Sequence, residues 1–171
     1  MKIVLYMATS LNGNITFGGN STDWVDKADW KYFYKITKDS KVIIMGSETF
    51  KQFADDFPQK QALNVVVTTK TELLNKKIDG AIFTDKSPKE IIKMLSNKGY
   101  KETCLIGGEK LNTSFIKDNL VDEIYVDIHP YIIGEGLRMF GSIDKMFKKL
   151  KLKDIKKLGK GLVLLHYLVE N

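Results

Sequence analysis

Two glycine-containing junctions are the strongest candidates for a ligand-binding site in this sequence. Leu105-Ile106-Gly107-Gly108 stands directly before a helical pattern at residues 109–117, and Gly46 separates the apolar run 42–45 from a second helical pattern that begins at Ser47. Glycine lets backbone N–H groups approach a ligand closely, and the N-terminus of a helix attracts anions. Each junction alone is also compatible with a tight turn that binds nothing. Because the G-x-G-x-x-G spacing is missing, an ordinary Rossmann dinucleotide site is not predicted.

A third junction carries hydroxyl groups in place of glycine. The apolar run 63–69 ends in Thr68 and Thr69, and Lys70 follows. The hydroxyls and the ammonium group of these residues could bind a ribose or a phosphate. Together, the three junctions predict a ligand with a pyrophosphate, held where strands end and helices begin.

Asp29 is the candidate acid. It opens a helical pattern that carries Trp30 and Phe33, and Trp24 lies just upstream. A carboxyl group among aromatic side chains loses hydration, which raises its pKa toward the range useful for giving a proton. The residues alone favour a simpler alternative, in which Asp29, or Asp26 before it, caps the helix or charges its N-terminus.

Other reactive side chains offer little. Cys104 is the single cysteine, which excludes a disulfide within the chain and zinc sites built from several thiolates. His129 and His166 have no spacing that joins them to a nucleophile or to a second histidine. No metal site is therefore predicted.

Short apolar runs alternate with helical patterns over most of the chain, which predicts the elements that position these residues. The alternation indicates an α/β fold with three layers, α/β/α, around a mostly parallel central sheet, and ligands bind at the carboxyl ends of such strands. The predicted strands are 3–8, 42–45, 63–69, 81–84, 103–106 and 124–128, and the predicted helices are 29–38, 47–53, 88–97 and 111–119.

The last quarter of the chain predicts antiparallel strands. Residues 150–158 and 162–169 are strand-like and flank Gly159-Lys160-Gly161, which is typical of a hairpin turn. The apolar run 162–165 is either an internal strand or half of a subunit contact, and we favour the internal strand.

Composition is that of a folded domain spanning residues 1–171. The chain is 43% hydrophobic and 28% charged, without repeats. No apolar run approaches the roughly 20 residues of a membrane span, and the N-terminus does not resemble a signal peptide, so a cytoplasmic protein without membrane partners is expected. The net charge is +6, but Arg138 is the sole arginine and the lysines are dispersed. This favours a solvated basic surface over a nucleic-acid site.

The chain resembles the dihydrofolate reductase superfamily, and specifically the branch related to the reductase domain of riboflavin biosynthesis. The resemblance covers nearly the whole chain. Its marks are residues 7–15, Asp23-Trp24, residues 29–33, 44–50, 105–111, 120–124 and 130–136. It implies the same fold, here with antiparallel C-terminal strands, acting as a monomer or a homodimer.

The resemblance also implies NADPH as the hydride donor. Ser47 stands where dihydrofolate reductases commonly carry an arginine for the 2′-phosphate, so NADH is an alternative. The residues that the resemblance assigns to the coenzyme are Ala8, Asn14, Ile15, Gly46, Ser47, Glu48, Thr49, Thr68, Thr69, Lys70, Ile106, Gly107, Gly108, Glu109, Lys110 and Leu111.

A heterocyclic small molecule is the implied substrate. Asp29 matches the acidic residue that binds the amino-pyrimidine edge of a pterin and supports its protonation. The residues assigned to the substrate are Tyr6, Ala8, Trp24, Asp29, Phe33, Thr49 and Lys60. The first expectation is reduction of dihydrofolate to tetrahydrofolate. The alternatives are reduction of a phosphoribosylamino-pyrimidine of the riboflavin pathway, or a nucleotide- or nucleic-acid-binding module without catalysis.

Overall fold

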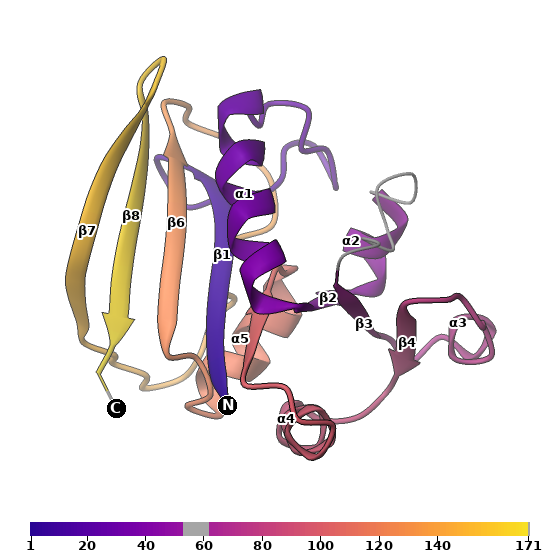
Figure 1. Cartoon of the computed structure of the whole chain (residues 1–171). Coiled ribbons are helices and arrows are strands. Elements are labelled where there is room, and N and C mark those ends of the chain that lie inside the picture. Colours follow the sequence, from indigo (N-terminus) through magenta and orange to yellow (C-terminus); the bar gives the residue numbers. More distant parts are fainter. Residues whose placement is uncertain (53–61, 171) are drawn as a thin grey trace.

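A central sheet of eight strands organises the computed structural model, which describes residues 1–52 and 62–170. The strands follow the order β4-β3-β2-β5-β1-β6-β8-β7 (Figure 1). Runs of apolar and β-branched residues form them, as expected for strands covered on both faces. Their bounds are β1 (Lys2–Ser10), β2 (Val42–Gly46), β3 (Leu63–Val67), β4 (Ala81–Thr84), β5 (Glu102–Leu105), β6 (Glu123–His129), β7 (Leu150–Gly159) and β8 (Leu162–Val169).

Strand β1 lies at the middle of the sheet and pairs in parallel with both β5 and β6. The strands from β4 to β6 are all parallel, whereas β8 runs antiparallel to β6 and to β7. This confirms the predicted fold class. β1 is longer than the predicted strand by one residue at its start and two at its end.

Helices cover both faces of the sheet. The helices α1 and α2 pack on one face and α4 and α5 on the other, with a hydrophobic cluster beneath each pair (Figure 1). Residues Asp29, Phe33, Thr37 and Ser40 of α1 recur at helical spacing and are its buried residues. The bounds are α1 (Lys27–Ser40), α2 (Ser47–Gln52), α3 (Thr71–Leu74), α4 (Pro88–Asn97) and α5 (Glu109–Lys117). The one-turn helix α3 was not predicted.

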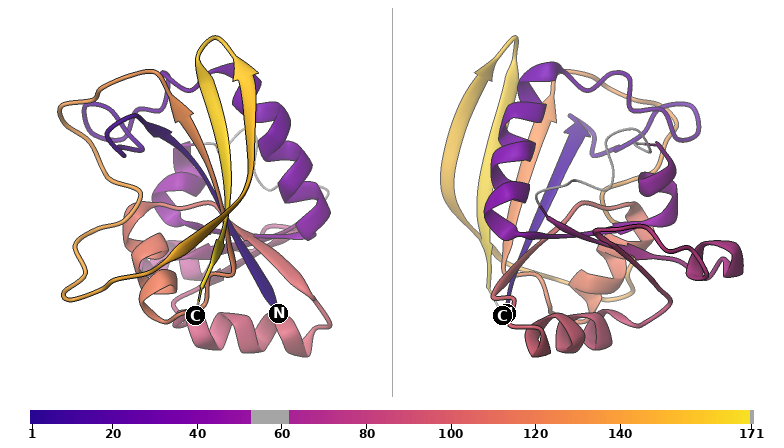
Figure 2. Two further views of the ribbon diagram at one scale, coloured as in Figure 1. Left: turned by 90° about the vertical axis from the view of Figure 1, so that its left-hand side faces the viewer. Right: turned by 45° about the vertical axis from the view of Figure 1, so that its right-hand side comes forward.

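The predicted hairpin joins β7 to β8 through Lys160 and Gly161. Both residues have a positive φ, 49° and 82°, which is the geometry of a two-residue turn that matches strand twist. β8 lies between β6 and β7, so the interpretation of residues 162–165 as an internal strand is right. β7 forms the exposed edge and rises beside α1 (Figure 2).

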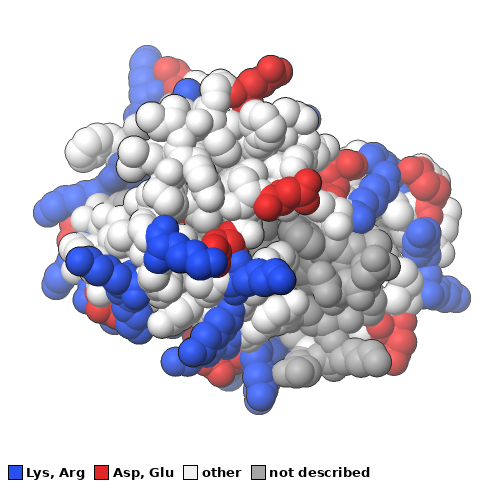
Figure 3. Space-filling view, turned by 90° about the horizontal axis from the view of Figure 1, so that it is seen from above, with Lys and Arg blue, Asp and Glu red and all other residues white. Residues whose placement is uncertain are grey.

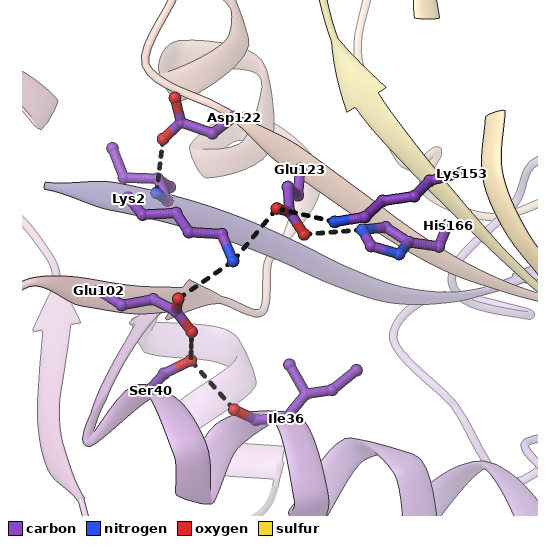
Figure 4. A network of polar contacts seen from close by, with 9 residues as sticks. Lys2, Ile36, Ser40, Glu102, Asp122, Glu123, Lys153 and His166 are labelled. Atoms are coloured by element: carbon purple, nitrogen blue, oxygen red, sulfur yellow. Dashed lines mark hydrogen bonds and ion pairs between the residues drawn. The ribbon is translucent and has the colours of Figure 1, made fainter. Parts of the chain in front are cut away.

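Near the two chain ends, a polar network ties several strands together (Figures 1 and 4). The ammonium group of Lys2 in β1 lies 3.1 Å from Glu102 of β5 and 3.2 Å from Glu123 of β6. Glu123 also contacts His166 of β8 at 2.7 Å and Lys153 of β7 at 3.7 Å. The network thus links five strands. Across residues 1–52 and 62–170, no helix combines the length and the apolar character needed to cross a membrane.

Candidate active site

A cavity of about 710 Å³ brings the three junctions and the candidate acid together. Its walls come from β1 and the loop that follows it, from α1 and α2, and from the segments after β3, β4 and β5. The lining residues are Tyr6, Met7, Ala8, Ile15, Thr16, Asn20, Thr22, Val25, Asp29, Trp30, Phe33, Gly46, Ser47, Glu48, Thr49, Gln52, Val67, Thr68, Thr69, Lys70, Asp85, Ile106, Gly108, Glu109, Lys110, Leu111, Ser114 and Leu137.

Gly46, Gly107 and Gly108 form a narrow backbone cradle in this cavity. The N–H of Gly46 donates to the carbonyl of Gly107 at 2.8 Å, and the peptide bond between Gly107 and Gly108 is cis. Gly107 has a φ of +100°, and a Cβ there would lie 3.1 Å from the sulfur of Met7. The conformation favours glycine, and any larger residue would also have to displace the Met7 side chain.

The N-terminus of α5 opens onto the same cavity. Gly108 is its N-cap and supplies no side chain to the free N–H groups of the first turn. The next three residues, Glu109, Lys110 and Leu111, line the cavity. An anionic ligand at this point would meet unpaired backbone donors and the positive end of the helix dipole.

Charged residues form the opposite rim, beside Thr68 and Thr69. The ammonium group of Lys70 lies 2.5 Å from a carboxylate oxygen of Glu48. This contact lowers the pKa of Glu48 and raises that of Lys70. Asp85, which follows β4, also lines the rim, although it was not predicted from the sequence. The rim can contact the hydroxyls of a ribose, but the positive charge of Lys70 is partly balanced by Glu48.

Asp29 closes the other end of the cavity and is 5% exposed. The hydroxyl of Tyr6 donates to its Oδ1 at 2.5 Å. Burial raises the pKa of Asp29, while the hydrogen bond from Tyr6 opposes the rise. The helix cap is Asp26, whose Oδ1 accepts from the N–H of Ala28 at 2.8 Å. Asp26 therefore provides the cap that the simpler alternative allowed, while Asp29 lies in the first turn of α1 with its carboxyl group hydrogen-bonded to Tyr6.

Aromatic rings make this end of the cavity apolar. Phe33 packs edge-on against Tyr6, with ring centroids 5.8 Å apart, and Trp30 lies 5.4 Å from Phe33. Trp24, which was assigned to the substrate, does not line the cavity. Its ring packs against His129 at 5.1 Å and Tyr131 at 6.4 Å. In the structure this ring therefore packs near the end of β6, and the assignment of Trp24 to the substrate stays a prediction.

Three other assigned residues lie outside the lining. The side chain of Asn14 donates to the carbonyl of Ile133 at 2.6 Å, and its backbone N–H donates to Ser10 Oγ at 3.0 Å. The loop itself therefore uses the groups of Asn14 that were expected to meet the coenzyme. Gly107 lies behind Gly108 and shapes the cradle without lining it. Lys60 falls outside the described residues.

Polar groups on α2 and on the loop after β1 also line the cavity, although the sequence did not predict them. The amide of Gln52 donates to the carbonyl of Asn20 at 2.9 Å and to the hydroxyl of Thr22 at 2.6 Å. All three residues line the cavity, so α2 holds the loop in place over it. No motif in the sequence indicates this contact, which joins residues 30 or more positions apart.

Asp127 and His129 of β6 were also missed, and they lie behind Asp29. Asp127 is fully buried, and no N–H or O–H group of the described residues donates to its carboxylate oxygens. The signal that could have found it is an acidic residue in the middle of the apolar run 124–128. Within residues 1–52 and 62–170, no group of three or more histidine, cysteine or acidic residues could hold a metal ion.

Comparison with known sequences finds two relatives that span nearly the whole chain and one that spans part of it. Two Bacillus subtilis proteins, YwjB and YyaP, are 27% and 28% identical, and each match covers 97% of this chain and 97% and 94% of theirs. The riboflavin biosynthesis protein RibD of Aquifex aeolicus is 32% identical over 61% of this chain and 32% of its own.

Solved structures share the fold. A Shewanella protein described as a putative riboflavin biosynthesis protein superposes with a TM-score of 0.81 at 22% identity, covering both chains fully. A pyrimidine reductase-like protein of Corynebacterium diphtheriae gives 0.77 at 17% identity, over 99% of this chain and 92% of its own. Residues 1–164 match the family described as the RibD C-terminal domain. The chain therefore belongs to the RibD C-terminal domain family, which has the fold of dihydrofolate reductase.

Proposed function

We propose that this protein is a reductase that uses NADPH, or NADH, to reduce a pyrimidine-like heterocycle of the kind found in riboflavin biosynthesis. One observation carries the proposal: a single cavity holds a glycine cradle at one end and a buried carboxyl group at the other. Membership of the RibD C-terminal domain family supports the riboflavin-type substrate over dihydrofolate, which was the first expectation.

The lining residues fit a nicotinamide dinucleotide. Gly46 and Gly108 leave backbone groups open to the cavity, and a Cβ on Gly46 would lie 3.7 Å from both the Gly107 carbonyl oxygen and the Gly108 nitrogen. The first turn of α5 would bind the pyrophosphate, while Thr68, Thr69 and Lys70 would contact the ribose at the adenosine end. When bound, the reduced nicotinamide supplies a hydride.

The chain itself would position the substrate and manage its proton. Phe33 offers an aromatic face to the ring, and Asp29 offers a carboxylate oxygen to the N–H groups of an amino-pyrimidine edge. Tyr6 orients that carboxyl group through its hydrogen bond. Gln52 holds the loop at Asn20 and Thr22, which helps to exclude water from the reacting atoms.

The molecular surface supports an enzyme over a nucleic-acid-binding module. Seen from the end at which β1 finishes, uncharged side chains make up much of the upper part of the view, and acidic residues lie among the lysines elsewhere on the described surface (Figure 3). A polyanion would instead favour a continuous basic stripe.

A panel of heterocycles tests the proposal. Phosphoribosylamino-pyrimidines, their dephosphorylated forms and dihydrofolate are each supplied with NADPH or NADH, and loss of nicotinamide absorbance is followed. We expect turnover with a pyrimidine. Oxidation with dihydrofolate alone would restore the first expectation, and no oxidation with any substrate would contradict a reductase.

Asp29→Asn tests the role of the acid. We expect turnover to fall by about 100-fold or more, because general acid catalysis contributes that much, while the dinucleotide Kd changes by less than about twofold. Asp23→Asn, at an exposed residue before the helix, is the matched control and should leave both constants unchanged. Unchanged turnover in Asp29→Asn would contradict the assigned role.

A further inference from the structure

Asp127 is a buried acid that the proposed mechanism does not use. It lies in β6, opposite Ala8 of β1, and is completely inaccessible to solvent. No N–H or O–H group of the described residues donates to either of its oxygens. An ionised carboxylate in such a place would lose its hydration without compensation, so this carboxyl group is best satisfied when it holds a proton.

Titratable groups of α1 and β1 lie closest to Asp127, and others lie farther away. Tyr6 and Ala8 lie on the same face of β1, and Ala8 is the register partner of Asp127. The hydroxyl of Tyr6 reaches Asp29 of α1 at 2.5 Å, so Asp29, Tyr6 and Asp127 share this face, and each affects the pKa of another. Cys104 of β5 is a buried thiol whose pKa burial raises, so it stays neutral. Asp26 lies farther out, before α1, where the ammonium group of Lys160 pairs with it at 3.3 Å.

The neighbour on β6 itself, His129, supplies no positive charge. Its Nε2 accepts the backbone N–H of Asp26 at 3.0 Å, so the neutral ring carries its hydrogen on Nδ1, which lies 4.0 Å from Asp127 Oδ1. Burial lowers the pKa of His129 and keeps the ring uncharged near neutral pH. Within the described part of the chain, no lysine or arginine forms an ion pair with Asp127 to balance a charge there.

We propose that Asp29 and Asp127 form a carboxyl pair that shares one proton, in which Asp127 is a positioning residue that keeps Asp29 charged and ready. Two acids that face each other in a buried site cannot both ionise readily. The surroundings of the two carboxyl groups differ, and this difference decides which of them holds the proton. Asp29 accepts a hydrogen bond from the Tyr6 hydroxyl and lines the cavity, and both features stabilise its ionised form. Asp127 has no hydrogen-bond donor among the described residues and does not line the cavity.

The direction of the pKa shifts agrees with this assignment. Burial, with the negative charge of Asp29 beside it, raises the pKa of Asp127 to about 8. Protonated Asp127 can donate a hydrogen bond to Asp29. Near neutral pH the pair then carries a single negative charge, on the member that lines the cavity.

The consequence for catalysis rests on the proposed function. Reduction of a C=N group by the hydride leaves its nitrogen in need of one proton. Asp29 delivers that proton as the proton of Asp127 moves to Asp29, so the pair ends with two carboxylates. One proton from water then restores the singly charged pair.

Titration of the free protein tests the pair without substrate or coenzyme. Aspartate labelled with ¹³C at Cγ is followed by NMR from pH 4 to pH 10. We expect two aspartates to titrate in widely separated steps, the upper one near pH 8. Titration of every aspartate below about pH 5.5 would overturn the proposal, whatever the outcome of the substrate panel.

Substitutions show which aspartate is responsible for each of the two titration steps. In Asp127→Asn the upper step should vanish. In Asp29→Asn it should stay but move down by a pH unit or more, because the like charge is gone. Asp79→Asn, at an exposed residue remote from the cavity, should leave both steps unchanged. An upper step that persists unshifted in either cavity variant would overturn the proposal, and Asp29→Asn keeps the test valid if Asp127→Asn does not fold.

Kinetics separates a positioning role from a merely structural one. With the pyrimidine substrate, kcat of the wild type should fall tenfold per pH unit above the upper step, because the pair has no proton left to give. Asp127→Asn should lower kcat at pH 7 at least tenfold, with KM changed less than threefold, and should remove that fall. An unaltered pH profile in this variant would contradict the shared proton.

Discussion

Two aspartates three residues apart, Asp26 and Asp29, show how position decides the behaviour of a side chain. Asp26 has extended backbone angles just outside α1, so its carboxylate can turn back to the N–H of Ala28. Asp29 lies within the first turn and faces the sheet, where the hydroxyl of Tyr6 meets it. The first carboxylate stabilises the helix, and the second becomes available to a ligand.

Asp127 should make the stability of the protein depend on pH. Its pKa is raised in the folded protein, to about 8, above the value near 3.9 of an unfolded chain. Between these values the folded state holds the extra proton, so the free energy of unfolding should fall as pH rises from about 5 to 8. The slope can approach about 1.4 kcal/mol per pH unit.

Asp127→Asn is expected to lack this contribution. Denaturant unfolding of both proteins at several pH values measures it, and the stability of the variant relative to wild type should increase steadily toward pH 8. Parallel stability curves would show that the carboxyl group of Asp127 is ionised across this range. The Asp79→Asn protein provides the reference for an exposed aspartate.

At the scale of elements, the junction between β5 and α5 depends on Gly107. In Gly107→Ala the Cβ would meet the sulfur of Met7 at 3.1 Å, and the φ of +100° is strained for alanine. We expect a loss of about 1–3 kcal/mol of stability. Because the cradle itself must shift, we also expect at least tenfold weaker dinucleotide binding by fluorescence titration.

Gly99→Ala is the matched control for that change. Gly99 also has a positive φ, +86°, but a Cβ there meets nothing within 4 Å, and the residue does not line the cavity. This variant should lose comparable stability while binding the dinucleotide normally. Equal loss of affinity in both variants would mean that general destabilisation, and not the cradle, accounts for the effect.

The polar network around Glu123 joins the strands at the opposite end of the sheet (Figure 4). His166 and Lys2 lower the pKa of Glu123 against the effect of burial. A lowered pKa means that the stabilisation is present above about pH 4.3 and is lost as pH falls through the folded-state value. Glu123→Gln should therefore cost about 1–3 kcal/mol at pH 7, and the cost should shrink toward pH 3.

Glu170→Gln provides the comparison for Glu123→Gln. Glu170 pairs with Lys149 at 3.4 Å on the surface, where such pairs contribute little. Denaturant unfolding at pH 7 should show less than about 0.5 kcal/mol for this variant. A similar small effect of Glu123→Gln would mean that the network does not hold the strands together.

Features carried by neighbouring residues could be predicted from the sequence, and those that join distant segments could not. Gly46 and Gly108 each lie between an apolar run and a helical pattern, so both junctions were predicted correctly. The turn at Lys160-Gly161 could also be predicted, because residues next to one another in the sequence form it. Asp127 and Asp29 are 98 positions apart in the sequence. The ring of Trp24 packs against His129, which lies more than 100 positions later. Only the folded sheet brings these groups together.

At the scale of the whole molecule, the cavity draws its lining from both halves of the sheet, from β1 and α1 as well as from the segments after β3 and β5. A ligand that fills it should therefore stabilise the entire fold. The stabilisation equals RT ln(1 + [L]/Kd), about 2.7 kcal/mol at 100 times the Kd. We expect NADPH to raise the denaturant midpoint without changing the m-value, because the same surface is exposed on unfolding.

The dependence on concentration makes this last prediction specific. Above saturation, each tenfold increase in NADPH should add about 1.4 kcal/mol, and Gly107→Ala should need at least ten times more ligand for the same gain. Nicotinamide alone, which cannot reach the cradle, is the control and should give no shift. Stabilisation by ATP equal to that by NADPH would assign the cavity to a nucleotide without a redox role, since the end near Asp29 would then contribute nothing to binding.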